Sequence, residues 1–345
     1  MELPELTDAA QVKALLDDER YVDQFTLAYI QMCIVIYQTN PGDIMHIAKH
    51  IANPKCVTPL TGCRWECRWG PTYDKYQGNL AIIATAVRIK DDQPMLNVVM
   101  IRATDLVDKM LTFSSFGDLE EIKEDFGIGT QVCVPWLPAS SSARLSAGSK
   151  LGFDVVSSLI EDGVTIYDYL GASLTGPPEK RPAIIVAGHS LGGCLTSVIA
   201  PWLATTFSDM TPPPHVAATS FAGPSAGNQA YADYAKGAVN SFHRYYNTLD
   251  SIPNWWADLP ANNIIFERDG METPLWMRLI NKGLAATIPA YTQPQDDRPI
   301  KGVFDLTMDW YAQFAHQHHA ETYLALLTGK PTTSGVDCET AGTRS

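Results

Sequence analysis

Ser190 has the residue type and the surroundings of a nucleophile. It stands at the centre of GHSLG, where Gly188 precedes it by two positions and Gly192 follows it by two. The spacing G-x-S-x-G places a serine on a sharp turn between a strand and a helix, with its hydroxyl exposed at a sheet edge. Glycines flank such a turn because a Cβ atom there would collide with neighbouring chain. His189 points in a different direction from Ser190 on this turn, which indicates a structural position for it.

The runs on either side of the motif agree with this interpretation. Residues 182–187 predict a buried strand and residues 191–207 predict a helix. A glycine-rich phosphate loop is one alternative, but neither G-x-x-x-x-G-K-[ST] nor G-x-G-x-x-G occurs. The other alternative is a serine that only forms part of the turn between strand and helix and takes no part in catalysis. The nucleophile therefore requires a base and an acid elsewhere in the chain.

Residues downstream could supply both groups. Asp250 follows residues 242–247, an aromatic run that predicts a strand, and Pro253 prevents a helix from starting at once. Three histidines stand just before a later apolar helical face: His316, His318 and His319. One of them could reach Ser190, while the others would begin a solvated helix. A three-histidine metal site is not expected, because no acidic ligand stands nearby.

The elements that must position these residues alternate between helix and strand. The predicted order is helix 152–161, strand 182–187, helix 191–207, strand 216–221, helix 228–239 and strand 242–247. This alternation predicts an α/β fold with a mostly parallel sheet and helices on both faces.

The rest of the chain adds simpler elements. Residues 7–37 predict an N-terminal helix capped by Thr7 or Asp8, and residues 79–89 and 95–103 predict a hairpin. Residues 105–150 have no sustained period and predict a long exposed connection. We expect one domain over 1–329, followed by a flexible polar tail over 330–345.

Composition excludes several classes of protein. The chain has 345 residues, 46% of them hydrophobic, and a formal net charge of -13. This charge argues against nucleic-acid binding, which needs clustered Lys and Arg. No apolar run has the roughly 20 residues of a membrane-spanning helix. The acidic N-terminus carries no secretory signal, so the expected location is cytoplasmic, or outside the cell if a signal is missing from this sequence.

Seven cysteines leave the redox compartment open. Cys56, Cys63 and Cys67 lie close together, so we expect one disulfide within this loop. Three sulfurs at these spacings match no usual zinc pattern. Cys33 and Cys194 are expected to be small core residues. We expect neither a metal nor an organic cofactor.

Four motifs resemble one family in their order along the chain. They are MIRATDL at 100–106, GHSLGG at 188–193, FAGPSAGN at 221–228 and YYNTLDSIP at 245–253. Across residues 20–328 the sequence resembles the fungal-type lipases, the class 3 lipase family. The resemblance implies the α/β-hydrolase fold, in which the triad follows the order serine, carboxylate, histidine.

The resemblance also implies a role for individual residues. Ser190 would be the nucleophile and Asp250 the orienting carboxylate, and HHAETYL favours His318 as the base, with His319 as the alternative. The oxyanion hole would be formed by Leu191, through its backbone N–H, and by Thr104. Ala103 stands where the family usually has glycine.

The resemblance implies a lipase or esterase that cleaves acylglycerol or fatty-acid esters, with peripheral contact to a lipid interface. The alternatives are a phospholipase or lipid acyltransferase and, from another class, an inactive binding protein. Residues 105–145 correspond to the movable lid of the family, although an ordinary surface loop would also fit their scattered apolar side chains, Leu111, Phe113, Phe116, Phe126 and Trp136. Residues 273–291 predict an amphipathic segment beside the pocket, or a packed surface helix, with four apolar residues: Leu275, Trp276, Leu279 and Ile280.

Overall fold

A seven-stranded sheet organises the protein. The computed structural model describes residues 3–38, 44–74, 78–103, 119–294 and 296–330. The strand order is β1-β2-β3-β8-β9-β10-β11. β1 and β2, and β2 and β3, pair antiparallel, whereas β3 and the strands beyond it are parallel. The bounds are β1 Cys63–Tyr73, β2 Leu80–Arg88, β3 Pro94–Arg102, β8 Ala183–His189, β9 Val216–Phe221, β10 Ser241–Asn247 and β11 Asp297–Ile300.

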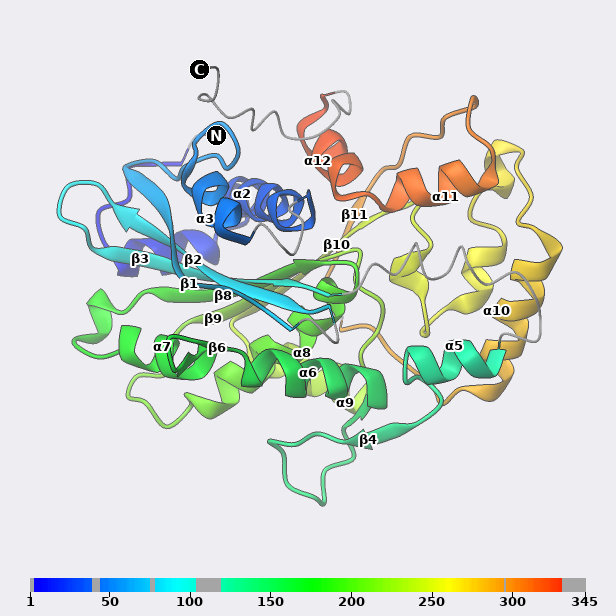
Figure 1. Ribbon diagram of the computed structural model, residues 1–345, viewed down its shortest axis with the longest axis horizontal. Helices are drawn as coiled ribbons and strands as arrows, with labels where there is room; N and C mark the ends of the chain where they lie inside the picture. The colour runs from blue at the N-terminus through cyan, green and yellow to red at the C-terminus, as the bar shows by residue number, and fades with distance from the viewer. Residues whose placement is uncertain (1–2, 39–43, 75–77, 104–118, 295, 331–345) are drawn as a thin grey trace.

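Helices cover both faces of the sheet (Figure 1). Successive side chains of a strand point to opposite faces, so Ile185 of β8 packs in one apolar cluster and Ile184 in another. The first core contains Ile185 and helices α1 Ala9–Leu16, α2 Glu19–Gln38, α3 Ile44–Ala52 and α12 Ala320–Thr328. The second core contains Ile184 and helices α6 Ala147–Ser158, α7 Ile166–Ser173, α8 Leu191–Thr206 and α9 Gln229–Ala238.

A third core lies beyond the carboxyl ends of the parallel strands (Figure 1). Buried Trp255, Phe266, Ile280 and Phe314 belong to it, and Leu191 packs against both this core and the second one. Its helices are α5 Leu119–Asp125, η4 Ile252–Asn254, η5 Leu259–Asn263, η6 Glu267–Asp269, α10 Leu275–Thr287 and α11 Trp310–His318. This core therefore begins beside the candidate nucleophile.

The alternating elements predicted for residues 182–247 are confirmed within a few residues at each end. The single helix predicted for residues 7–37 is wrong, because two helices, α1 and α2, meet at Asp17 and Asp18. The Asp18 carboxylate accepts the backbone N–H of Arg20 at 3.0 Å. A carboxylate that accepts a nearby backbone N–H favours a helix start over a helix interior.

The long exposed connection predicted for residues 105–150 is wrong for its described part. Residues 119–150 contain α5, the paired strands β4 Gln131–Cys133 and β5 Arg144–Ser146, and the start of α6. Phe126 and Leu145 are buried. Further short elements absent from the prediction are β6 Ile160–Glu161, β7 Val164–Thr165 and η3 Pro178–Lys180. The polar tail from residue 331 lies outside the described residues.

The expected disulfide within the Cys56–Cys67 loop does not form. Cys56 is disulfide-bonded, but Cys63 and Cys67 are both free. These two lie on the same strand, β1, and pair with different residues of β2. Cys33 and Cys194 are buried, as expected, and burial raises the pKa of the Cys194 thiol to about 11.

Candidate active site

The turn that carries Ser190 joins β8 to α8. Ser190 has φ 60° and ψ -129°, which is unusual for a residue with a side chain. A Cβ on Gly188 would lie 2.5 Å from the carbonyl oxygen of Gly192, and a Cβ on Gly192 would overlap the carbonyl oxygen of Ile101. The backbone N–H of Ser190 donates to the carbonyl of Phe221 at 2.9 Å. The strand, the flanking glycines and this hydrogen bond together keep Ser190 in its strained backbone conformation.

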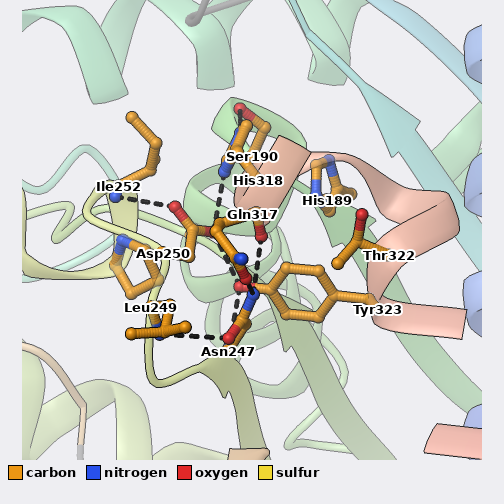
Figure 2. Close-up of polar contacts among 12 residues, drawn as sticks. His189, Ser190, Asn247, Leu249, Asp250, Ile252, Gln317, His318, Thr322 and Tyr323 are labelled. Carbon is orange, nitrogen blue, oxygen red and sulfur yellow. Dashed lines mark hydrogen bonds and ion pairs between the residues drawn. The ribbon is translucent and has the colours of Figure 1, made fainter. Parts of the chain in front are cut away.

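Three buried side chains form a hydrogen-bonded chain (Figure 2). His318 Nε2 lies 2.8 Å from Ser190 Oγ, and His318 Nδ1 lies 2.8 Å from Asp250 Oδ2. The exposed fractions of Ser190, His318 and Asp250 are 3%, 4% and 2%. These contacts leave Nε2 facing the serine hydroxyl while the carboxylate fixes the opposite nitrogen, which is the arrangement that activates a serine.

The Asp250 carboxylate is held from two further directions. The backbone N–H of Ile252 donates to Oδ1 at 2.9 Å, and the Tyr323 hydroxyl donates to Oδ2 at 2.7 Å (Figure 2). Burial, with the nearby Asp250 charge, raises the pKa of Tyr323 well above its usual value. The phenol therefore stays protonated near neutral pH and remains a donor there.

A buried amide pair fastens the segment of Asp250 to the segment of His318. Asn247 Nδ2 donates to the carbonyl oxygen of Gln317 at 2.9 Å and to its Oε1 at 2.6 Å. The backbone N–H of Asn247 donates to the Tyr323 hydroxyl at 3.0 Å. The end of β10 is thus tied to the end of α11, one residue before the histidine (Figure 2).

Sequence reasoning did not identify Asn247, Gln317 or Tyr323 as parts of the site. Tyr323 stands in HHAETYL, the segment that favours His318, but its sequence position predicts no contact with Asp250. A signal was available, because a buried tyrosine requires a hydrogen-bond partner for its hydroxyl, and Asn247 lies within the motif that contains Asp250. Which partner each would find depends on tertiary contacts that the sequence does not display.

The corner between α11 and α12 separates the candidate bases. His319 has φ -59° and ψ 139°, so the helix stops there and α12 begins at Ala320. His318 points inward to Ser190, whereas His319 is exposed and His316 is half-buried. Burial lowers the pKa of His316. The geometry places His318, and neither of its neighbours, against the serine.

His189 lies beside the triad (Figure 2). Its ring packs on the rings of His318 at 4.7 Å, Tyr323 at 5.6 Å and Tyr37 at 5.7 Å, measured between centroids. The Tyr37 hydroxyl donates to the His189 carbonyl at 2.8 Å. Burial lowers the pKa of His189 well below its usual value, so the ring is neutral. His189 therefore supports the turn and the His318 segment together.

The predicted oxyanion residues are only partly described. Leu191 opens α8, so its backbone N–H is one of the free donors at a helix start. Ala103 is buried beside the end of β3, but Thr104 lies outside the described residues. No cluster of three or more His, Cys, Asp or Glu side chains suited to a metal occurs in the described part of the chain.

Several residues of the predicted lid lie outside the residues that the structure describes. Leu111, Phe113 and Phe116 are not among the described residues. Phe126 packs against Trp256 with ring centroids 5.6 Å apart, and Trp136 Nε1 donates to the Tyr234 hydroxyl at 2.6 Å. These two aromatic residues therefore lie against different parts of the protein. The amphipathic helix predicted within 273–291 is confirmed as α10, with Ile280 buried and Leu275 and Leu279 exposed.

Residues 98–259 match the family model described as Lipase (class 3). The resemblance to the class 3 lipases is confirmed. A secreted alkaline triacylglycerol lipase of Penicillium cyclopium is 37% identical over 75 residues, which are 22% of this chain and 25% of that relative. The match thus spans a quarter of the curated relative's length.

Solved structures confirm the α/β-hydrolase fold. M37 lipase has a TM-score of 0.71 and 23% identity, and the match covers 89% of this chain and 92% of that chain. A mutant form of MDLA from Penicillium cyclopium has a TM-score of 0.52 and 16% identity, with 86% and 85% covered. At these identities the likeness concerns the fold alone. In the described ranges, none of the helices combines the length and the apolar character needed to span a bilayer.

Proposed function

We propose that this chain is a serine carboxylic-ester hydrolase, a lipase or esterase that forms an acyl-enzyme on Ser190. One observation carries the proposal: His318 lies at hydrogen-bond distance from both Ser190 Oγ and Asp250 Oδ2. An unassisted serine hydroxyl is a weak nucleophile, and an adjacent imidazole oriented by a carboxylate activates it. The class 3 lipase match of residues 98–259 agrees with ester chemistry.

Acylation begins when Ser190 Oγ attacks the ester carbonyl carbon and His318 Nε2 takes the hydroxyl proton. Asp250 stabilises the imidazolium that forms and keeps the correct ring nitrogen toward the serine. The tetrahedral intermediate then collapses, the carbon–oxygen bond to the alcohol breaks, and His318 returns the proton to the departing alcohol. The acyl group remains on Ser190.

Deacylation repeats these steps with water. His318 takes a proton from a water molecule, whose oxygen attacks the acyl carbon, and collapse returns the proton to Ser190 Oγ and releases the acid. The backbone N–H of Leu191, with Thr104, would hold the oxyanion in both steps. Losing one such donor costs about 3 kcal/mol of transition-state stabilisation.

We propose acylglycerols or similar fatty esters as the substrate class, with peripheral contact to a lipid interface. The relative from Penicillium cyclopium is named a triacylglycerol lipase. The apolar third core begins at Leu191, the residue after the nucleophile. An apolar wall beside the reacting serine suits an acyl chain better than a polar substrate.

The test combines active-site labelling with turnover. We expect the full chain to react with a fluorophosphonate at Ser190 and to hydrolyse p-nitrophenyl esters, with preference among acyl chain lengths distinguishing a lipase from an esterase. Ser190→Ala should abolish both reactions, and Tyr167→Phe, which alters an exposed residue of α7, serves as a surface control. Turnover that survives Ser190→Ala in pure protein would overturn the proposal.

Two other outcomes point to the alternatives. Labelling of Ser190 without hydrolysis of simple esters would favour a phospholipase or lipid acyltransferase, which product analysis by headgroup would identify. Ligand binding without labelling or turnover, unchanged by Ser190→Ala, would instead indicate an inactive binding protein.

A further inference from the structure

Exposed apolar side chains concentrate in one segment of the chain. Ten large hydrophobic residues are exposed among those that the structure describes, and six of them fall within residues 264–311. The six are Ile264, Leu275, Leu279, Val303, Leu306 and Tyr311. Single exposed hydrophobic residues are ordinary on protein surfaces, whereas exposed hydrophobic residues that lie together mark an interaction site.

Helix α10 presents the best-defined part of this segment. Its inner side chains, among them Met277, Ile280 and Leu284, are buried in the third core. On the opposite face, spacings of four, three and four residues align a stripe: Leu275, Leu279, Lys282 and Ala286. Leu275 is 65% exposed and Leu279 40%. The helix is therefore apolar on its outer face as well as on its inner one.

The charge of α10 is opposite to that of the whole protein. The helix contains Arg278 and Lys282 and no acidic residue, whereas the chain as a whole has a net charge of -13. Arg278 faces Glu272 with a separation of 3.5 Å, and that carboxylate is 80% exposed, so the pair is weak. Two cations, one of them weakly paired with Glu272, thus accompany the exposed apolar side chains of α10 on an acidic protein.

A shallow groove runs beside this face. It has a volume of about 650 Å³ and lies between α10 and η5. Leu275, Leu279 and Pro260 line it together with the cations Arg278 and Lys282. The long aliphatic stems of Arg and Lys can lie along apolar surface while the charged ends reach outward. This combination suits acyl chains whose polar ends carry negative charge.

An aromatic pair lies at the edge of the same surface. Trp276 Nε1 donates to the Tyr311 hydroxyl at 3.1 Å, and the two rings stack with centroids 6.3 Å apart. Tryptophan and tyrosine favour the boundary between water and lipid, because each has an apolar body and a polar edge.

We propose that the outer face of α10 docks on a lipid–water interface that carries anionic amphiphiles. This inference rests on the proposed ester hydrolase function, whose fatty-acid products carry negative charge. A basic amphipathic helix binds such an interface through buried apolar area and electrostatic attraction. The acidic remainder of the surface is repelled by the same interface, so one orientation is selected.

Docking in this orientation places the interface at the end of the molecule that carries the reacting serine. The inner face of α10 and the side chain of Leu191 belong to the same third core. The anionic interface would therefore meet the protein on the side toward which the parallel strands run (Figure 1), and Ser190 directly follows one of them, β8.

Vesicle co-sedimentation tests the proposal with the full chain carrying Ser190→Ala, which prevents lipid turnover. Probes are vesicles of phosphatidylcholine alone and of phosphatidylcholine with one quarter phosphatidylglycerol. We expect at least tenfold tighter partitioning to the anionic vesicles, weakened by 0.5 M NaCl. The double variant Arg278→Gln/Lys282→Gln should remove this preference, and Leu275→Ser/Leu279→Ser should weaken binding to both vesicles more than tenfold.

The matched control is Leu151→Ser/Ile160→Ser, which removes two residues that are 49% and 57% exposed and lie outside the 264–311 segment. It should bind like the parent. Equal binding by the parent and both α10 variants, or equal loss in the control, overturns the docking proposal.

Hydrolysis of a soluble short-chain ester, measured with Ser190 present, separates this inference from the proposed function. The α10 variants should retain it within twofold. Absence of turnover in the parent with normal vesicle binding would overturn the hydrolase function and leave the docking surface intact.

Discussion

Tyr323 Oη lies 2.7 Å from Asp250 Oδ2, the same carboxylate oxygen that faces His318 Nδ1 at 2.8 Å. Phenol and imidazole thus share one oxygen, while the backbone N–H of Ile252 occupies the other. All three donors reach a carboxylate that is 2% exposed. The carboxylate is consequently fixed in the plane that orients the imidazole.

Removing the phenol should slow turnover without weakening substrate binding. In Tyr323→Phe, Asp250 loses one donor and the Asn247 N–H loses its acceptor. We expect kcat to fall about tenfold with KM nearly unchanged, and the free energy of unfolding to fall by about 1–3 kcal/mol. Steady-state kinetics on a soluble ester and urea unfolding measure these effects. An unchanged kcat would show that the phenol does not orient the carboxylate.

Replacing the carboxylate should be far more damaging. Asp250→Asn keeps the side-chain shape but offers an amide that can favour the wrong imidazole tautomer, so we expect kcat to fall about 10⁴-fold. Fluorophosphonate labelling should slow in parallel. Retention of more than a tenth of the parent kcat would remove Asp250 from the mechanism.

Replacing His318 and replacing His319 should have very different effects on turnover. His318→Ala removes the group 2.8 Å from Ser190 Oγ and should lower kcat by at least about 10³-fold. His319→Ala alters an exposed side chain and should stay within twofold of the parent. The same ester assay compares them, and a larger loss in His319→Ala would reverse the assignment of the base.

A methyl group at the turn should disrupt the fold locally. Gly192→Ala would force a Cβ into the carbonyl of Ile101, so we expect a loss of about 3 kcal/mol or more in unfolding free energy. Gly237→Ala in α9 is the matched control, because its new Cβ has no atom within 4 Å apart from the adjacent backbone of its own helix. It should stabilise the protein by about 0.4–1 kcal/mol. Equal effects of the two substitutions would contradict the close packing of the turn.

Acid should destabilise the protein partly through His189. Its pKa is well below the usual value because the ring is buried, so the folded state stays neutral while the unfolded imidazole takes up a proton near pH 6.5. Below about pH 6.5 the unfolded state then binds more protons than the folded state. The free energy of unfolding therefore falls as the pH is lowered, by up to about 1.4 kcal/mol per pH unit.

Urea unfolding at pH 8 and pH 5.5 measures this loss. His189→Gln should shrink the difference between the two pH values, while buried His215, whose pKa is also lowered by burial, retains its share. An equal difference in parent and variant would show that His189 contributes no pH dependence.

Much of the fold is predictable because its signals are local. The strand–GHSLG–helix run over 182–207 combines apolar periodicity with a turn that only glycines permit, and the structure has β8, Ser190 and α8 there. The break at Asp18 is not visible in the periodicity, because a single side-chain cap competes with a continuing helix.

A residue of the candidate site could be predicted where its local sequence context indicates its role. Asp250 stands in a loop after a strand, but the choice between His318 and His319 depends on where α11 stops. The roles of Gln317 and Tyr323 arise only from contacts over 70 and 73 residues of sequence.

His318 stands at the junction of two helices that belong to different cores. Trp310 and Phe314 of α11 pack in the third core, whereas Ala320 and Tyr323 of α12 pack in the first. Loosening of either core shifts the imidazole away from Ser190 while the central strands remain paired. On heating, fluorophosphonate reactivity should therefore disappear at a lower temperature than the circular-dichroism signal of the sheet, so thermal inactivation precedes unfolding.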